Sequence, residues 1–508
     1  MMQASSTRLS GGWLIKLLLM AAVNAFGLYC LFACWMAGST IVFVAVLISL
    51  IIIDVVYFSK RFLPGKYLIP GMVFLLVFQL FVMIYTGYIA FTNYGSGHNS
   101  TKEDAVAAIT AKYETRVGPV VPAKVVTSIS KTGLAVVKDG KVYVGEDGKA
   151  LEPAPGAKVK DGQIVSVPDW KVADFADVVD NQMQITQMRL PAADGAAWRT
   201  EDGEHAYLSR SSMKYDAGKQ TMTDTQTGKV YKATDDGAFT AADGTALSPG
   251  WRVAVGANNF KQMVSGTDIG VPFFKSLIWT FVFAIVSVAS TFAFGLLLAL
   301  IFNDKRVRGR KIYRSLFILP YAFPGFLAAL VWKGMLNQKF GFINTVLLQG
   351  AEIPWLSDGT LAKIAILGVN LWLGFPYMFL VCTGALQALP DDVMEAATID
   401  GAGWWRKLRS ITLPLVLVAT TPLLISSFAF NFNNFALIYM LTGGGPQYPG
   451  NPLGVGETDI LISFVYTIAF DSGAKNYGLA SAMSLVIFII VGLIAWISFR
   501  RTKTLEEI

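Results

Sequence analysis

The sequence predicts an all-α polytopic membrane protein with eight transmembrane helices and a large β-rich domain inserted between helices 3 and 4. Of its 508 residues, 54% are hydrophobic and only 15% are charged, which is typical of chains that cross a membrane repeatedly. Apolar runs of about 20 residues, the length that spans hydrocarbon, occur near residues 13–37, 40–57, 67–91, 272–302, 312–336, 361–389, 413–441 and 477–499. A polar stretch, 93–272, separates the third run from the fourth.

The first run is predicted to stay in the mature protein as a membrane anchor. Its apolar core is longer than that of a signal peptide, and a second apolar run follows at once.

Positive charge predicts the orientation, because cytoplasmic loops of membrane proteins are rich in Lys and Arg. The connections 38–39 and 442–476 are nearly free of both residues. With both termini cytoplasmic, one face carries Lys60, Arg61, Lys66, Lys305, Arg306, Arg308, Arg310, Lys311, Arg314, Arg406, Lys407, Arg409, Arg500, Arg501 and Lys503. Residues 93–272 then lie on the opposite, exported side.

The net charge of +7 requires no nucleic-acid partner. Residues 93–272 hold 20 Lys and Arg against 22 Asp and Glu, so the excess positive charge lies in the membrane part. All three cysteines, Cys30, Cys34 and Cys382, fall in apolar runs. The exported region is therefore predicted to fold without disulfides.

Turn signals predict a β-rich fold for residues 93–272. Seven Asp-Gly dipeptides punctuate this stretch, and 134–137 and 141–144 flank one of them as a predicted hairpin. Residues 101–113 are predicted to be helical. We expect one β-sandwich with a helix or two; the alternative is two smaller β units divided near Pro168 or Pro191.

Residues 390–414 predict a helix–turn–helix on the cytoplasmic side. Asp392 and Glu395 form a helix-start signal, so the first helix is expected to begin near Val393. Gly401 supplies the left-handed residue that ends it. A second, basic segment, 404–412, is expected to stop at Pro414. The small side chains of Ala396 and Ala397 would let the first helix enter a cleft on another protein.

These residues carry a family resemblance. The pattern E-A-A-x-x-x-G (395–401) followed by I-T-L-P (411–414) resembles the EAA loop of ATP-binding-cassette import permeases, and the chain therefore resembles type I importers of that class. The segments WLGFPY (372–377), SFAFNFNNFAL (427–437) and GGGP (443–446) are similar to the maltose/maltodextrin branch of this family.

The resemblance implies both partners and site residues. It implies a bacterial inner-membrane subunit that pairs with a second, related permease subunit, with two copies of an ATPase, and with a periplasmic sugar-binding protein that meets the exported domain. It implies that Glu395, Ala396, Ala397 and Gly401 contact the ATPase. It also implies that a maltose or maltodextrin molecule contacts Leu373, Gly374, Tyr377, Phe430, Asn431 and Asn434.

The residues themselves support a polar site in the seventh run. Asn431, Asn433 and Asn434 interrupt an apolar stretch, where an unsatisfied amide is costly, so they should face a bundle interior or a watery cavity. Asn431 and Asn434 are predicted to share a helix face. Amides beside a ring suit a sugar, although hydrogen bonding between helices explains them equally well. In the sixth run, Gly374 and Pro376 are expected to break the helix.

No catalytic residue, metal site or cofactor is predicted. The two histidines, His98 and His205, belong to no cluster with metal-ligand spacing, and the chain lacks the phosphate-binding sequence G-x-x-x-x-G-K-[ST]. Energy for active transport would then come from another subunit.

The predicted domains are 1–66 (two helices and a cytoplasmic loop), 67–92 (helix 3), 93–272 (β-rich) and 273–508 (helices 4–8, with the coupling loop at 390–414). Two rival classes remain: an ion-coupled secondary transporter, which would need buried carboxylates, and a receptor, which would need an output domain. Within the importers, another sugar or glycerol-phosphate is the alternative substrate.

Overall fold

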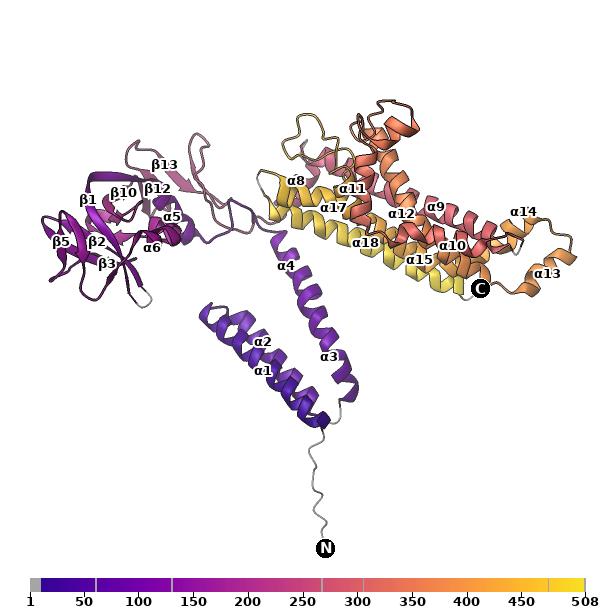
Figure 1. Ribbon diagram of the computed structural model, residues 1–508, viewed down its shortest axis with the longest axis horizontal. Coiled ribbons are helices and arrows are strands. Elements are labelled where there is room, and N and C mark those ends of the chain that lie inside the picture. The colour runs from indigo at the N-terminus through magenta and orange to yellow at the C-terminus, as the bar shows by residue number, and fades with distance from the viewer. Residues whose placement is uncertain are drawn as a thin grey trace, which may run out of the picture. The chain divides into compact units, whose positions relative to one another are not determined.

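The computed structural model describes residues 11–59, 62–128, 131–265, 268–304, 306–473 and 475–506. Lys60, Arg61 and Lys305, which enter the predicted charge bias, lie outside these ranges. The chain forms two compact units, Met1–Gly87 and Tyr88–Ile508, and each is described by itself (Figure 1).

The first unit is helical. It contains α1 (Gly11–Met36), α2 (Thr40–Phe58), α3 (Leu63–Leu75), a π-helical turn (Leu76–Leu80) and the start of α4 (Phe81–Ile89). Gly38, at φ +65°, makes the turn between α1 and α2. The two helices then pair through a hydrogen bond from Asn24 Nδ2 to Asp54 Oδ1 at 2.9 Å. The Asp54 carboxylate is therefore hydrogen-bonded within the hairpin.

The described residues contain six helices long and apolar enough to cross a membrane, or seven if the bent pair Arg310–Ala322 and Gly325–Met335 is one span. The six are Gly11–Met36, Leu63–Ile89, Gly270–Asn303, Gly359–Gln387, Trp404–Phe432 and Tyr477–Ile497. α2 contains a shorter apolar helix, Val42–Phe58. The chain is thus a polytopic membrane protein.

Strands follow α4 in two separate sheets. The described part of the larger sheet has eight strands, ordered β4-β3-β2-β1-β10-β9-β8, with β7 paired to β1. Their bounds are β1 Glu114–Ser128, β2 Lys131–Lys138, β3 Lys141–Glu146, β4 Glu152–Pro153, β7 Lys171–Val172, β8 Leu190–Pro191, β9 Ala196–Arg199 and β10 His205–Ser211. The smaller sheet is the meander β11 (Met213–Asp216), β12 (Thr221–Asp224), β13 (Val230–Ala233) and β14 (Phe239–Ala241).

Short elements complete the β-rich region. A small ribbon pairs β5 (Lys158–Lys160) with β6 (Gln163–Ser166). The helices are α5 (Lys102–Lys112), α6 (Phe175–Asp180), α7 (Gln182–Gln187), a 3₁₀ turn (Ala193–Gly195) and α8 (Asn258–Ser265). α5 begins with a reciprocal cap between Thr101 and Asp104, which confirms the predicted helix. The predicted hairpin is also confirmed, since β2 pairs with β3 around Asp139-Gly140, both at positive φ.

A single β-sandwich is therefore not found. The two sheets have separate cores: Met222, Phe239 and Trp251 pack with α5 around the meander, whereas Leu134 and Leu190 belong to the larger sheet. The larger sheet and the meander meet near Ser212, so neither Pro168 nor Pro191 is the boundary between them. Pairing of β10 with β1 extends the larger sheet to Ser211, and that long-range pairing leaves no local sequence signal.

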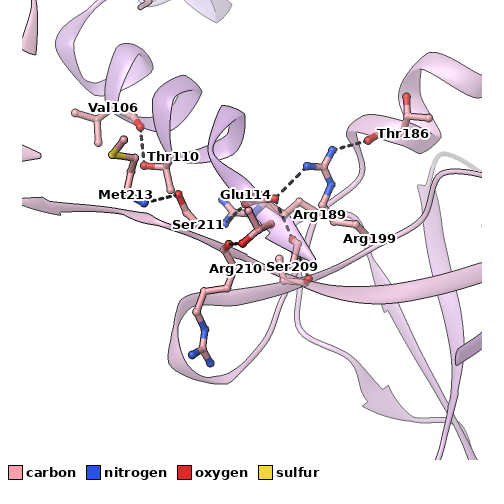
Figure 2. Close-up of polar contacts among 12 residues, drawn as sticks. Val106, Thr110, Glu114, Thr186, Arg189, Arg199, Ser209, Arg210, Ser211 and Met213 are labelled. Atoms are coloured by element: carbon pink, nitrogen blue, oxygen red, sulfur yellow. Dashed lines mark hydrogen bonds and ion pairs between the residues drawn. The ribbon is translucent and has the colours of Figure 1, made fainter. Parts of the chain in front are cut away.

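A buried ion cluster marks this boundary. Figure 2 shows Glu114, the first residue of β1, between Arg189 and Arg199. The Glu114 side chain is 2% exposed, and its two oxygens lie 2.5 Å from Arg189 Nη2 and 3.0 Å from Arg199 Nη1. Ser209 also donates its hydroxyl to Glu114. A buried carboxylate needs such partners, because desolvating an unpaired charge is very costly.

The rest of the second unit is a helical core. Its helices are α9 (Gly270–Asn303), α10 (Arg310–Ile318), α11 (Gly325–Met335), α12 (Gly359–Gln387), α13 (Asp391–Ile399), α14 (Trp404–Lys407), α15 (Leu413–Phe432), α16 (Phe435–Leu441), α17 (Leu461–Tyr466) and α18 (Tyr477–Glu506). A 3₁₀ turn (Leu319–Ala322) and π-helical turns (Ile343–Leu347, Leu408–Thr412, Thr467–Asp471) join them.

Glycine lets α9 and α12 pack closely. A Cβ on Gly295 would lie 2.7 Å from backbone atoms of Met378 and Phe379, and one on Gly374 would lie 2.8 Å from Thr291 Cγ2. These contacts bring Thr291 of α9 and Gly374 of α12 to one position, where both line the cavity described below.

Candidate substrate cavity and coupling segment

A cavity of about 610 Å³ lies within the helical core. Residues of α9, α12, α15 and α16 line it, together with the bend between α10 and α11. The structure brings all six residues that the sequence predicted as substrate contacts to this one cavity: Leu373, Gly374, Tyr377, Phe430, Asn431 and Asn434. They come from two helical runs that are about 60 residues apart in the chain.

The amides of this cavity form a chain of hydrogen bonds. Asn370 Nδ2 donates to Asn431 Oδ1 at 2.8 Å, and Asn434 Nδ2 donates to Asn370 Oδ1 at 3.4 Å. Asn431 Nδ2 in turn donates to the carbonyl of Ser427 at 2.8 Å. Asn370 and Asn431 are 5% and 8% exposed. Buried amides are thus satisfied across helices, so the hydrogen-bonding explanation holds for Asn431 alongside any role toward a ligand.

A helix break, rather than a shared helix face, places Asn434. α15 ends at Phe432, and Asn434 is the N-cap of α16, where its Oδ1 accepts from Leu437 N at 3.4 Å. The expectation of one continuous helix is therefore wrong here. Asn side chains compete with helical hydrogen bonding and favour caps, and consecutive Asn433 and Asn434 provide such a site. Asn433 is exposed, does not line the cavity and donates to the carbonyl of Ala429 at 3.2 Å.

Aromatic rings form the other wall. Tyr321 and Tyr377 are stacked, with ring centroids 6.4 Å apart and planes 20° apart. Tyr321 lies in the 3₁₀ turn of a 91° bend that includes Pro320 and ends before Gly325. Phe430 is 70% exposed. These rings present faces and two hydroxyl groups to a cavity that also holds amides.

Two neighbouring residues of the sixth run do not reach the cavity. Phe375 is buried, with its ring centroid 5.3 Å from Phe294 and 6.4 Å from Phe317. Pro376 is also buried, within a helix that continues from Gly359 to Gln387. The predicted helix break at Gly374 and Pro376 is therefore absent, because neighbouring helices pack tightly enough around α12 to hold it.

Sequence reasoning missed Asn370 and Tyr321. Asn370 is an isolated amide in an apolar run, so the argument applied to Asn431 would have found it. Tyr321 carries no such signal, since a tyrosine between prolines is common at a helix bend.

The predicted coupling segment is a separate, exposed feature. α13 begins at Asp391, close to the predicted start near Val393, and no side chain caps it at Pro390. Glu395 and Ala396 are exposed, whereas Ala397 is 8% exposed. Gly401 has φ +74° and ends the helix as predicted. Lys407 Nζ donates to Thr398 Oγ1 at 2.9 Å, which holds the two arms of the segment together.

The second arm does not stop at Pro414. α14, the π-helical turn Leu408–Thr412 and α15 form one helix, Trp404–Phe432, of 29 residues. In the π turn, Leu413 N donates to the carbonyl of Leu408, five residues back, so the register is shifted just before the proline that lacks an N–H. The coupling segment and the amide cavity are thus at opposite ends of one helix.

Comparison with known proteins identifies the family. Residues 271–503 match the family described as "Binding-protein-dependent transport system inner membrane component", and residues 73–148 match "N-terminal of TM subunit in PBP-dependent ABC transporters". The chain is 37% identical over 460 residues to the maltose/maltodextrin transport system permease protein MalF of Vibrio vulnificus (strain YJ016), covering 88% of this chain and 87% of the relative. It is 34% identical over 475 residues to MalF of Escherichia coli (strain K12), covering 88% of each.

Among solved structures, a bacterial ABC transporter involved in import of the acidic polysaccharide alginate is 20% identical, with a TM-score of 0.42 over 49% of this chain and 84% of that one. The chain belongs to the MalF family of binding-protein-dependent transport-system permeases.

Proposed function

We propose that this chain is a MalF-type permease subunit of an ATP-driven, binding-protein-dependent importer of maltose or maltodextrin, and that the cavity around Asn434 holds the sugar during transport. The observation that carries the proposal is the convergence of amides and rings on one cavity of about 610 Å³ in a member of this family. Sugar hydroxyl groups need both donors and acceptors, whereas the C–H faces of a sugar pack against aromatic rings.

Each predicted contact has a defined role in the proposal. Asn434 is half-buried, and its amide makes two long bonds of 3.4 Å, one donated to Asn370 Oδ1 and one accepted from Leu437 N. Because long bonds are weak, this amide is well placed to exchange protein bonds for sugar bonds. Tyr377 and Phe430 offer ring faces, while Leu373 and Gly374 shape the wall. Asn431 helps to orient the Asn434 amide, because Asn370 is hydrogen-bonded to both side chains.

The topology in this proposal has eight spans, with α2 and the bent α10–α11 pair each crossing once. Both termini are cytoplasmic, because this orientation puts most Lys and Arg of the short loops on one side. Residues 1–66, 67–92, 93–272 and 273–508 are the corresponding domains, and 93–272 is periplasmic. A folded, exported β-rich domain offers surface to a MalE-like periplasmic sugar-binding protein.

Energy is supplied by a separate subunit. A dimer of a MalK-like ATPase binds the coupling segment at Glu395, Ala396, Ala397 and Gly401, and a MalG-like permease subunit completes the pathway. Val393, Ile399, Trp404 and Trp405 are all more than 40% exposed in this polar segment, and apolar side chains on such a surface favour a protein partner. The helix Trp404–Phe432, about 43 Å long at 1.5 Å per residue, carries the motion toward the cavity.

The test is uptake by the complex reconstituted in vesicles, with a panel of maltose, longer maltodextrins, other disaccharides and glycerol-phosphate. We expect maltose or maltodextrin to be taken up and Asn434→Ala to abolish most of this uptake. The matched control is Asn433→Ala, which removes a neighbouring amide outside the cavity. Equal uptake by both variants would show that the cavity does not bind the sugar, and preference for another solute would reassign the substrate.

A further inference from the structure

A second cavity lies in the first unit. It has a volume of about 390 Å³, and residues from the start of α1, the end of α2 and the start of α3 line it. Gly12, Ile15, Lys16, Leu19, Tyr57 and Lys66 are among them. Figure 1 shows these three helix ends close together within this unit. Nothing in the transport pathway described above uses this cavity.

Positive charge faces the cavity without a neutralising carboxylate. Lys16 and Lys66 both line it and are half-buried. Within the described residues, no Asp or Glu oxygen is within ion-pair distance of either ammonium. The Lys16 ammonium instead lies 5.0 Å from the centroid of the ring of Phe58, the residue after Tyr57 of the cavity lining. Two such ammonium groups in one cavity attract an anion.

Two tyrosines add hydrogen-bonding groups to the lining of the same cavity. Tyr57 donates its hydroxyl to the carbonyl of Lys66 at 2.8 Å, which ties α2 to α3 and leaves the hydroxyl oxygen free to accept. Tyr67 also lines the cavity and is 81% exposed. Tyrosine beside lysine at the ends of apolar helices is the arrangement found where a membrane meets water.

The remaining wall is apolar and open. Ile15, Leu19 and Leu63 line the cavity and are 60%, 63% and 61% exposed. They continue onto apolar helix surface, so hydrocarbon rather than water covers them in a membrane. A molecule that fits all three features has an anionic head for the lysines and an apolar tail for these side chains.

We propose that this cavity binds an anionic membrane lipid, with its phosphate between Lys16 and Lys66 and its acyl chains along Ile15 and Leu19. Basic pockets between transmembrane helices recognise lipid headgroups in this way. A free phosphate ion shares the headgroup chemistry, but it makes no use of the apolar wall. The proposal depends on the chain spanning a membrane and not on which sugar is carried.

The experiment is native mass spectrometry of the full chain in detergent, titrated with phosphatidylglycerol or phosphatidylcholine. We expect the most tightly bound phosphatidylglycerol molecule to have a higher affinity for the chain than any phosphatidylcholine molecule. Lys16→Gln with Lys66→Gln should weaken it by about 25-fold, since each lysine near a lipid surface contributes about a factor of five. Lys16→Arg with Lys66→Arg should retain it. The control, Lys138→Gln with Lys141→Gln in the exposed β2–β3 turn, removes the same charge elsewhere and should change nothing.

Two results would overturn the proposal. The first is equal phosphatidylglycerol affinity in the wild type and in the Lys16→Gln, Lys66→Gln chain. The second is a result in which inorganic phosphate displaces the lipid and binds the lipid-free chain as tightly as phosphatidylglycerol does. The site would then recognise a soluble anion. The arginine variant distinguishes loss of charge from misfolding. Lipid binding that is lost in the glutamine variant but kept in the arginine variant reflects the charge, because arginine keeps the charge and replaces the same side chains.

Discussion

Asn370 donates a hydrogen bond from Nδ2 to Asn431 Oδ1 at 2.8 Å, joining α12 to α15 across 61 residues of sequence. Its own Oδ1 accepts from Asn434 at 3.4 Å. One buried side chain thus orients both amides that the sequence predicted as sugar contacts. Asn370 links the two walls of the cavity.

Asn370→Ala is expected to weaken maltose uptake. Removal of one partner leaves the buried Asn431 oxygen without its donor, which costs about 1–3 kcal/mol. If this cost falls on the sugar-bound state, the KM for uptake rises by about fivefold or more. Uptake kinetics of the reconstituted complex measure this change, with Asn433→Ala as the control. An unchanged KM in the Asn370 variant would show that the amides act independently.

Gly401→Val is expected to uncouple ATP hydrolysis from uptake. Valine in a left-handed conformation, the one that Gly401 adopts at φ +74°, is disfavoured by about 1–2 kcal/mol or more, so the turn between α13 and α14 should be displaced. Sugar transported per ATP hydrolysed should fall. Gly403→Val provides the comparison, because Gly403 has φ −65° and ψ 167°, which any residue adopts. Similar coupling in the two variants would contradict the docking role.

Gly295→Ala is expected to destabilise the helical core. The added Cβ would lie 2.7 Å from backbone atoms of α12. These atoms cannot shift without moving the helix, so we expect the free energy of unfolding to fall by about 1–3 kcal/mol. Gly368→Ala is the matched control within α12, since nothing lies within 4 Å of its Cβ position. That change should leave the melting temperature equal or slightly raised, as alanine favours helices. Thermal unfolding of the purified complex distinguishes the two.

Asp459 is expected to make stability depend on pH. It lies in the loop between α16 and α17, where burial raises the pKa of its carboxyl to about 6, from an ordinary 3.8. The folded protein therefore binds this proton more tightly than the unfolded chain. The contribution to stability is complete below 3.8 and is lost as pH rises through about 6, a change of about 3 kcal/mol.

The contribution of Asp459 should thus make the melting temperature of the protein higher at pH 5 than at pH 7. Asp459→Asn should reduce this difference. Asp139→Asn, at an exposed turn, serves as the control. An identical pH profile for the wild type and the Asp459 variant would mean that the carboxyl does not titrate in this range.

Sequence patterns predicted the elements of this protein better than their packing. Apolar length located the long helices, and Asp-Gly turns located the β2–β3 hairpin, because both signals are local. The break between Phe432 and Phe435, the orientation of Phe375 toward Phe294 and the pairing of β10 with β1 depend on neighbours distant in the chain. Asn431 and Asn434 nevertheless line one cavity, since polar residues in apolar runs must face a protected interior. The other four predicted contacts, which line it as well, came from the family resemblance and not from a local polar signal.

In the proposed mechanism, a separate ATPase that acts through residues 391–412 drives sugar through this chain. Accumulation of labelled maltose in proteoliposomes tests it most directly, with ATP enclosed and with each subunit omitted in turn. We expect accumulation only when the chain, its permease partner, the ATPase, the sugar-binding protein and ATP are all present. Accumulation by the chain alone, driven by an ion gradient without ATP, would contradict it.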